Sequence, residues 1–65
     1  MTLEEVIKSK GIKKKFIAEQ LGLTPKGFRF KLQGRTEFLP SEIEQITKIL
    51  GLSKSEMIHI FFPNL

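Results

Sequence analysis

The sequence contains no cysteine, which removes two ways of stabilising a small chain. Without thiols the protein can form neither disulfide bonds nor thiolate metal sites. A domain of 65 residues also buries only a modest fraction of its surface. We therefore expect its stability to come from closely packed helices or from association with a second copy of the chain.

The sequence has a single histidine, His59, and this restricts the chemistry available to it. One histidine offers no paired ligand for a metal ion, and neither a cysteine nucleophile nor a glycine-rich phosphate loop is present. The serines fall at expected helix ends without a histidine partner nearby. We expect His59 to be structural or exposed to solvent. These absences predict a protein that is not an enzyme, with no catalytic residue, no cofactor, no metal and no small-molecule substrate.

Long apolar runs are also missing, since no stretch approaches the roughly 20 residues that a membrane-spanning helix needs. The first ten residues, MTLEEVIKSK, are charged and lack the apolar segment of a secretory signal. No strand-like alternation, internal repeat or low-complexity segment is present. We expect one all-helical domain over residues 1–65, located in the cytoplasm of a bacterial or phage-infected cell and not bound to a membrane.

Positive charge is concentrated in the first half of the chain. Residues 1–35 hold nine Lys and Arg residues against three Glu residues, whereas residues 36–65 hold two against four. The net charges of the two parts are therefore +6 and −2. Such asymmetry is typical of a protein that presents one face to a polyanion. Solvated surface lysines are the alternative explanation of the charge alone.

The stretch Ile12–Arg35 has the pattern of two short helices joined by a tight turn. The first is predicted to run from about Lys13 to Leu21 and to end at Gly22, where a left-handed backbone suits a residue without a Cβ. Thr24 can cap the second helix, with Pro25 at its first position and its end at Gly34. This layout is typical of a DNA-reading helix-turn-helix.

Three further helices are predicted from capping boxes, in which a Ser or Thr and a Glu three residues later satisfy first-turn N–H groups. The boxes are TLEE at 2–5, SEIE at 41–44 and SKSE at 53–56, and the helices that follow end at Gly11, Gly51 and Pro63. Apolar residues at helical spacing should supply the core. They are Leu3, Val6, Ile7, Ile17, Ala18, Leu21, Phe28, Ile43, Ile46, Ile49 and Leu50.

The C-terminal segment is more apolar than one face of a short helix can bury. We expect Met57, Ile58 and Phe61 to cover the core. The excess, Ile60, Phe62 and Leu65, could form a two-fold interface with another copy of the chain. Alternatively, the segment folds back over the first and fourth helices.

The helix over residues 25–33 can enter the major groove with the side chains near its N-terminus towards the base edges. Lys26 and Arg29 can donate to guanine O6 and N7, and Pro25 lies beside them. Phe30 either contacts a thymine methyl group or packs beside Phe28. The predicted phosphate-binding residues, on the two sides of this helix, are Lys13, Lys14, Thr24, Gln33 and Arg35.

The residues Ile17-Ala18, Gly22-Leu23-Thr24, Phe28 and Gly34 resemble the lambda repressor/Cro (XRE-type) family of helix-turn-helix regulators. The resemblance continues through Phe38-Leu39-Pro40 and Leu50-Gly51-Leu52-Ser53, so it covers nearly the whole chain. It implies a five-helix domain that binds operator DNA, usually as a dimer on two half-sites. A chain of this length is more similar to Cro than to larger repressors, and suggests a phage or prophage regulator.

By position, the resemblance places Lys14 where the family often has a phosphate-holding glutamine. It places Pro25, Lys26 and Phe30 at base-reading positions, and Gln33 at an amide that meets the DNA backbone. Two departures stand out. Pro25 cannot make the hydrogen bond of a glutamine side chain. Lys31 occupies a usually aliphatic position, so that either its stem lies along the core or Leu32 replaces it.

The sequence thus favours a sequence-specific double-stranded DNA-binding protein, a repressor or Cro-like regulator that acts by occupying an operator. The alternative is a protein-interaction module, an antirepressor or antitoxin-type partner, that uses the apolar C-terminal helix. Binding of single strands or RNA is less well supported, since the aromatic platforms for stacking bases usually lie on an exposed sheet.

Overall fold

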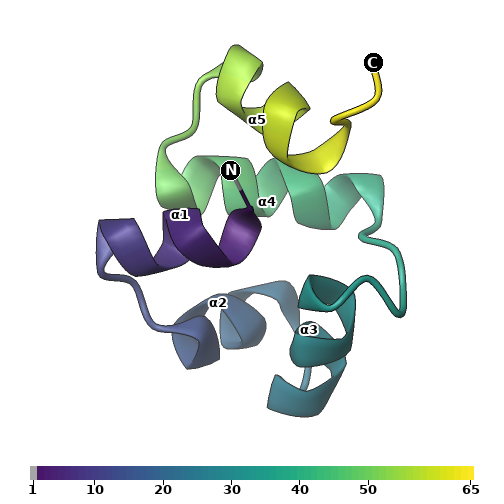
Figure 1. Cartoon of the computed structure of the whole chain (residues 1–65). Coiled ribbons are helices and arrows are strands. Elements are labelled where there is room, and N and C mark those ends of the chain that lie inside the picture. The colour runs from purple at the N-terminus through teal and green to yellow at the C-terminus, as the bar shows by residue number, and fades with distance from the viewer. Residues whose placement is uncertain (1) are drawn as a thin grey trace.

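Helices account for all the regular structure in the computed structural model, which describes residues 2–65 (Figure 1). The helices are α1 (Leu3–Lys10), α2 (Lys14–Leu21), α3 (Pro25–Leu32), α4 (Pro40–Leu50) and α5 (Lys54–Phe61). The described residues contain no strand, which confirms the predicted all-helical class. In Figure 1, α2 and α3 form the lower end of the molecule, with α1 and α4 above them and α5 at the top. None of the helices in this part of the chain has the length and apolarity to cross a membrane.

Two of the three predicted capping boxes are confirmed. At the start of α1, the Glu5 N–H donates to Thr2 Oγ1 at 3.2 Å and the Thr2 N–H donates to Glu5 Oε1 at 2.9 Å. At the start of α5, Ser53 and Glu56 exchange the same two bonds at 2.8 and 3.1 Å. These bonds satisfy N–H groups that the first turn of a helix leaves without a partner.

The capping box predicted at residues 41–44 is wrong. Helix α4 begins at Pro40, and Leu39 is its N-cap residue. The Leu39 N–H donates to Glu42 Oε1 at 2.8 Å, so Glu42 takes the role expected of Glu44. Proline explains the shift, because its fixed φ suits the first helical position and its missing N–H costs nothing there.

The two confirmed boxes predict that acid destabilises the protein. The pKa of Glu5 and that of Glu56 lie below the ordinary value of 4.5. The main cause is the hydrogen bond from the backbone N–H of the cap residue, and the second is the hydrogen bond with its hydroxyl group. The pKa of each carboxyl group is lower in the folded state than in the unfolded state. The carboxylate therefore stabilises the fold fully at a pH above its unfolded-state pKa, and this stabilisation is lost as the pH falls through its folded-state pKa. We expect the melting temperature to fall on acidification below about pH 4.5.

Thermal unfolding followed by circular dichroism over a pH series measures this loss. The matched variant is Glu5→Gln/Glu56→Gln, whose amide oxygens can still accept the cap hydrogen bonds but do not titrate. We expect the melting temperature of this variant to fall less steeply in acid than that of the wild type. Identical pH dependence in both proteins would contradict a contribution of these carboxylates.

The turn between α2 and α3 is set by Gly22 and Thr24. Gly22 has a φ of +71°, and the following N–H, of Leu23, donates to the Ala18 carbonyl at 2.9 Å. This pattern closes a helix with a left-handed glycine. Thr24 Oγ1 accepts the Gly27 N–H at 3.0 Å, and Pro25 opens α3 as predicted. Helix α2 begins one residue later than predicted, because Lys13 is its N-cap residue.

The core lies where α1, α2, α3 and α4 converge. Phe28, Ile7, Ile17 and Ile46 are its largest fully buried side chains. The complete buried cluster consists of Leu3, Val6, Ile7, Ile17, Ala18, Phe28, Ile46, Leu50 and Leu52. Leu21 and Ile49 pack against this cluster, as predicted, whereas Ile43 is half-buried outside it.

Helix α5 packs on the core through only one of the three residues that the sequence predicted. Phe61 does cover the core, with its ring edge-on to Phe38 at a centroid distance of 5.5 Å. Ile60 packs beside it, whereas Met57 and Ile58 are half-buried outside the core cluster. The expected split of the tail is therefore wrong for these residues.

Lys31 and Glu42 form a nearly buried ion pair that joins the end of α3 to the start of α4. Lys31 Nζ lies 3.1 Å from Glu42 Oε1, and the two side chains are only 13% and 9% exposed. Lys31 Nζ also donates to the Glu37 carbonyl at 2.8 Å. Leu32 packs against the core as well. Both explanations offered for the unusual lysine therefore hold, because its stem is buried and Leu32 contributes to the packing.

Candidate nucleic-acid interface

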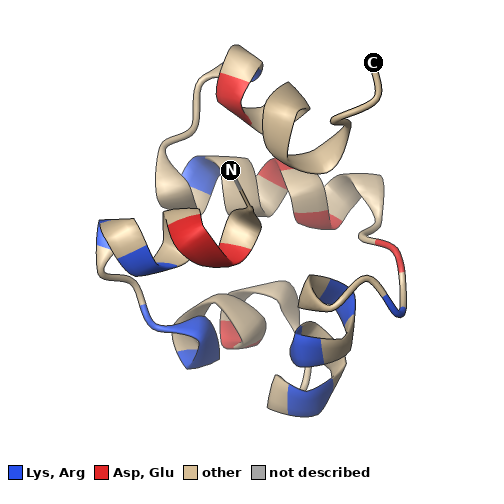
Figure 2. Cartoon of the chain, viewed as in Figure 1, with Lys and Arg blue, Asp and Glu red and all other residues tan. Residues whose placement is uncertain are grey.

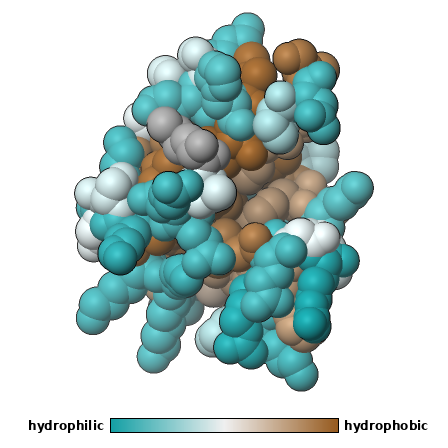
Figure 3. Space-filling model, in the orientation of Figure 1, coloured by the Kyte–Doolittle hydropathy of each residue, from teal (hydrophilic) through white to brown (hydrophobic). Residues whose placement is uncertain are grey.

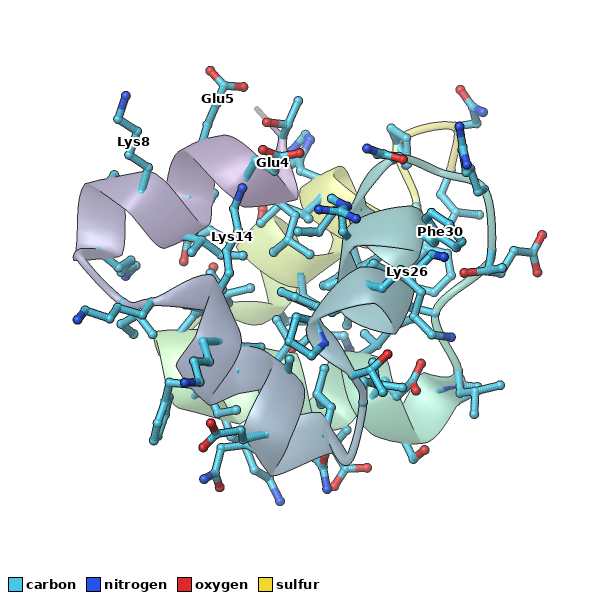
Figure 4. All side chains as sticks on the ribbon, turned by 90° about the horizontal axis from the view of Figure 1, so that it is seen from below. Glu4, Glu5, Lys8, Lys14, Lys26 and Phe30 are labelled. Carbon is cyan, nitrogen blue, oxygen red and sulfur yellow. The ribbon has the colours of Figure 1, made fainter. Side chains whose placement is uncertain are left out.

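Helix α3 has one buried side and one exposed side. Phe28 is 1% exposed and makes an edge-on contact with Phe38 at a centroid distance of 6.2 Å. Lys26 and Phe30 precede and follow Phe28 by two residues, which places them about half a turn away from it. Figure 4 shows these two side chains next to each other on α3. The outward side of α3 therefore presents an ammonium group beside an aromatic ring.

Two cations lie close to the ring of Phe30. Lys26 Nζ lies 5.6 Å from the centroid of the Phe30 ring, and Arg35 Cζ lies 4.9 Å from it. Gly34, with a φ of +80°, turns the chain back so that the Arg35 N–H donates to the Phe30 carbonyl at 3.0 Å. Phe30 is half-buried and outside the core cluster. Of its two predicted environments, packing with Phe28 in the core is therefore wrong.

A groove of about 440 Å³ runs between α3 and the start of α2. It brings together four of the predicted DNA-contacting residues, namely Lys14, Pro25, Arg29 and Gln33. Its other lining residues are Glu4, Lys15, Phe28 and Leu32. The four predicted residues come from two helices and are exposed, so one extended ligand can reach all of them.

The charge at this end of the molecule is mostly unpaired. Figure 2 shows Lys and Arg gathered on α2, α3 and the adjoining loops, with acidic residues mainly on α1, α4 and α5. Within residues 2–65, the lysines that form ion pairs are Lys14, Lys31 and Lys48. The other cations of this end, Lys13, Lys15, Lys26, Arg29 and Arg35, have no carboxylate within 4.0 Å in the same range. They are therefore available to bind an anion.

Lys14 is the exception among the predicted phosphate-binding residues. Its Nζ lies 3.0 Å from Glu4 Oε2, and Figure 4 shows its side chain extending from α2 towards α1. Both side chains are about half exposed, at 54% and 51%. An exposed pair of this kind contributes about 0–1 kcal/mol, so a phosphate group can compete with Glu4 for the ammonium.

Two other predicted phosphate-binding residues, Thr24 and Lys13, lie at the starts of α3 and α2. Thr24 uses its hydroxyl oxygen to accept the Gly27 N–H. A Cβ on Gly27 would lie 3.1 Å from that oxygen, so glycine at this position leaves room for the cap. Lys13 is exposed as the N-cap residue of α2 and does not line the groove.

Sequence reasoning missed Lys15 and Glu4 as residues of the groove. The run Lys13-Lys14-Lys15 is visible in the sequence, but which of its members faces α3 depends on how α2 is rotated. Glu4 lies on α1 and reaches the groove only through the fold. The cluster of Lys26 and Arg35 around the Phe30 ring was likewise not predicted.

Residues 2–65 contain no group of three or more His, Cys, Asp or Glu side chains that could hold a metal ion. His59 is exposed on α5. On the side of the molecule in Figure 3, hydrophilic side chains cover the lower end, and apolar atoms are visible mainly in the upper part. The polar and charged end of α2 and α3 is therefore the candidate interface.

No protein-family model matches this chain, and neither a curated protein nor a solved structure matches it.

Proposed function

We propose that this protein is a sequence-specific double-stranded DNA-binding regulator that acts by occupying an operator. The observation that carries the proposal is the exposed side of α3. It combines Lys26, Arg29 and Gln33, which can donate hydrogen bonds, with the half-buried ring of Phe30. Cations without an ion-pair partner surround it within the described residues. Binding needs no catalytic step and no cofactor.

In this proposal α2, the turn and α3 act as a helix-turn-helix of the lambda repressor-like type. Helix α3 lies in the major groove, where Lys26 and Arg29 donate to base edges. The N-terminus of α2, with Lys14 and Lys15, approaches a phosphate of the DNA backbone, because N–H groups and ammonium groups both favour an anion there. Gln33 lines the same groove as Arg29 and would contact the DNA backbone where it passes α3.

Dimerisation on DNA is part of the proposal. Phe62 and Leu65 are 42% and 91% exposed, which leaves apolar surface available at the C-terminal end. Phe62 also lines a second groove of about 540 Å³, whose walls combine apolar residues such as Phe38, Ile43 and Met57 with the charged residues Glu37, Glu44 and Lys48. Ile60 packs against the core, so the proposed interface now depends on Phe62 and Leu65 rather than on all three residues. Two copies would place two α3 helices on neighbouring half-sites.

Replacing Arg29 by alanine tests base reading. Because a good base contact contributes about 1–3 kcal/mol of discrimination, we expect the variant to lose that much affinity for its preferred site and to relax specificity there. The measurement is fluorescence anisotropy with the selected site and with a scrambled duplex. Equal losses on the two duplexes would show that Arg29 does not read bases.

Lys15→Ala and Lys14→Ala are the matched comparison, since both residues line the same groove and are assigned to phosphate. We expect each to weaken binding to all sequences alike and to lower the slope of log affinity against log salt by about one. A loss confined to the selected site would instead make the lysine a base reader. Lys54→Ala, at the start of α5, should change neither quantity.

The alternative, a protein-interaction module, is favoured by one observation, the exposure of Phe62 and Leu65. In that case the double variant Phe62→Ser/Leu65→Ser would lose its protein partner, and Arg29→Ala would not. The DNA proposal predicts the opposite pattern for binding to a duplex that carries a single half-site. Arg29→Ala weakens that binding, and the double variant does not. The two activities are therefore separable with the same set of proteins.

A further inference from the structure

Phe30 and Lys26 form a defined pair on the outward side of α3. Lys26 Nζ lies over the Phe30 ring at 5.6 Å from its centroid, so the ammonium and the ring are direct neighbours. Phe30 is half-buried without belonging to the core cluster, so part of its ring is accessible to a ligand. The pair thus offers a hydrogen-bond donor and an apolar surface side by side.

The major groove contains one chemical partner for each member of this pair. Guanine presents two acceptors there, N7 and O6, whereas thymine presents an apolar C5-methyl group. An ammonium has donors only, and a phenylalanine ring can make an apolar contact only. Lys26 therefore suits guanine and Phe30 suits the thymine methyl group.

The spacing limits how far apart these bases can be. Neighbouring base pairs are about 3.4 Å apart along the DNA axis. The distance of 5.6 Å between Lys26 Nζ and the Phe30 centroid lies between one and two such steps. Arg35 also holds the ring in place, through its guanidinium at 4.9 Å and its backbone bond to Phe30. A fixed ring favours one base position over its neighbours.

Building on the proposed function, we infer that Phe30 and Lys26 read a thymine and a guanine within two base pairs of each other in each half-site. Phe30 contacts the methyl group of the thymine, and Lys26 donates to the guanine. The inference names part of the operator, which the proposed function leaves open. It also assigns Arg35 as a positioning residue for the Phe30 ring in addition to its place beside the DNA backbone.

The test uses DNA analogues that remove single groups. In a site obtained by selection from random duplexes, each thymine is replaced in turn by deoxyuridine, which lacks the methyl group. Each guanine is replaced by 7-deazaguanine, which lacks the N7 acceptor. For the wild-type protein we expect one deoxyuridine position per half-site to weaken binding roughly fourfold, as for one buried methyl group. A guanine analogue within two base pairs of it should weaken binding roughly two- to tenfold.

Protein variants assign each effect to its residue. Phe30→Ala should bind the thymine and deoxyuridine duplexes equally, and Lys26→Ala should bind the guanine and 7-deazaguanine duplexes equally. Phe16→Ala is the matched control, because Phe16 is an exposed phenylalanine of α2, and it should keep both effects. Circular dichroism establishes that each variant is folded, and the wild-type measurements stand independently of the variants.

Three results would overturn the inference. In the first, a site is enriched but every thymine tolerates deoxyuridine. In the second, the deoxyuridine effect persists in Phe30→Ala. In the third, the sensitive thymine and guanine lie farther apart than two base pairs. All three leave the proposed function standing, because the protein still binds its site specifically. If selection enriches no site at all, the proposed function and the inference fail together.

Discussion

Phe28→Ala should lower the free energy of unfolding by about 3–5 kcal/mol, the largest stability loss that we expect from a single core truncation. Phe28 is 1% exposed, and its ring packs edge-on against Phe38. Removing it leaves a cavity where α3 joins the core. At about 0.05–0.15 kcal/mol per residue, a chain of 65 residues has a total stability of only a few kcal/mol to about ten. The loss would remove most or all of the stability at the lower end of this range and up to about half of it at the upper end.

Phe16→Ala provides the control for this loss. Phe16 is 48% exposed on α2 and does not belong to the core. We expect a change of less than about 1 kcal/mol, as for most surface substitutions. Urea unfolding followed by circular dichroism measures both variants. Similar losses in the two proteins would show that α3 is not anchored through Phe28.

Glu42→Ala should cost about 3–5 kcal/mol, because it leaves the nearly buried Lys31 ammonium without its counter-charge. The same Glu42 oxygen accepts the Leu39 N–H at 2.8 Å, so the substitution also removes the cap of α4. We expect the end of α3 and the loop before α4 to lose order with it. Urea unfolding gives the free energy, and hydrogen exchange of the Leu39 amide reports the loss of the cap.

The ion pair between Lys48 and Glu44 provides the matched comparison, because both pairs involve α4 but differ in exposure. The side chains of Lys48 and Glu44 are 76% and 69% exposed. Glu44→Ala should therefore lower the free energy of unfolding by only about 0–1 kcal/mol. The double variant Lys31→Met/Glu42→Met should be more stable than Glu42→Ala, since it removes both charges from the interior. Equal losses for Glu42→Ala and Glu44→Ala would contradict the assignment of a buried pair.

The fold could be predicted largely from local signals. Thr2 with Glu5, and Ser53 with Glu56, are close in sequence, and their side chains need only the first turn of the helix to meet. Gly22 marks the end of α2 for an equally local reason, its positive φ. Such signals are readable because no distant part of the chain is needed to complete them.

Predictions that depended on tertiary contacts succeeded less often. Lys31 and Glu42 are eleven positions apart, and nothing local indicates that they pair. Four of the last five residues of the short helix α5 are apolar, so its periodicity alone did not show that Ile60 faces the core. The contact of Phe61 with Phe38 decided this orientation, and it exists only once α3, α4 and α5 are assembled.

The candidate site was predictable in its charge and less so in its geometry. The concentration of Lys and Arg in residues 1–35 indicated which end of the molecule carries the excess of positive charge. The pairing of Lys14 with Glu4 was not predictable, because the two residues lie on different helices. The same holds for Arg35 and Phe30, whose contact depends on the turn at Gly34.

The most direct test is to measure binding of the wild-type chain to duplex DNA across a salt series, after selection from random sequences. We expect a palindromic site to be enriched and bound tightly, with affinity falling steeply as salt rises, because phosphate contacts release counterions. Weak, salt-sensitive binding without an enriched site would make the basic end a non-specific docking surface. No binding even at low salt would contradict the proposed function outright.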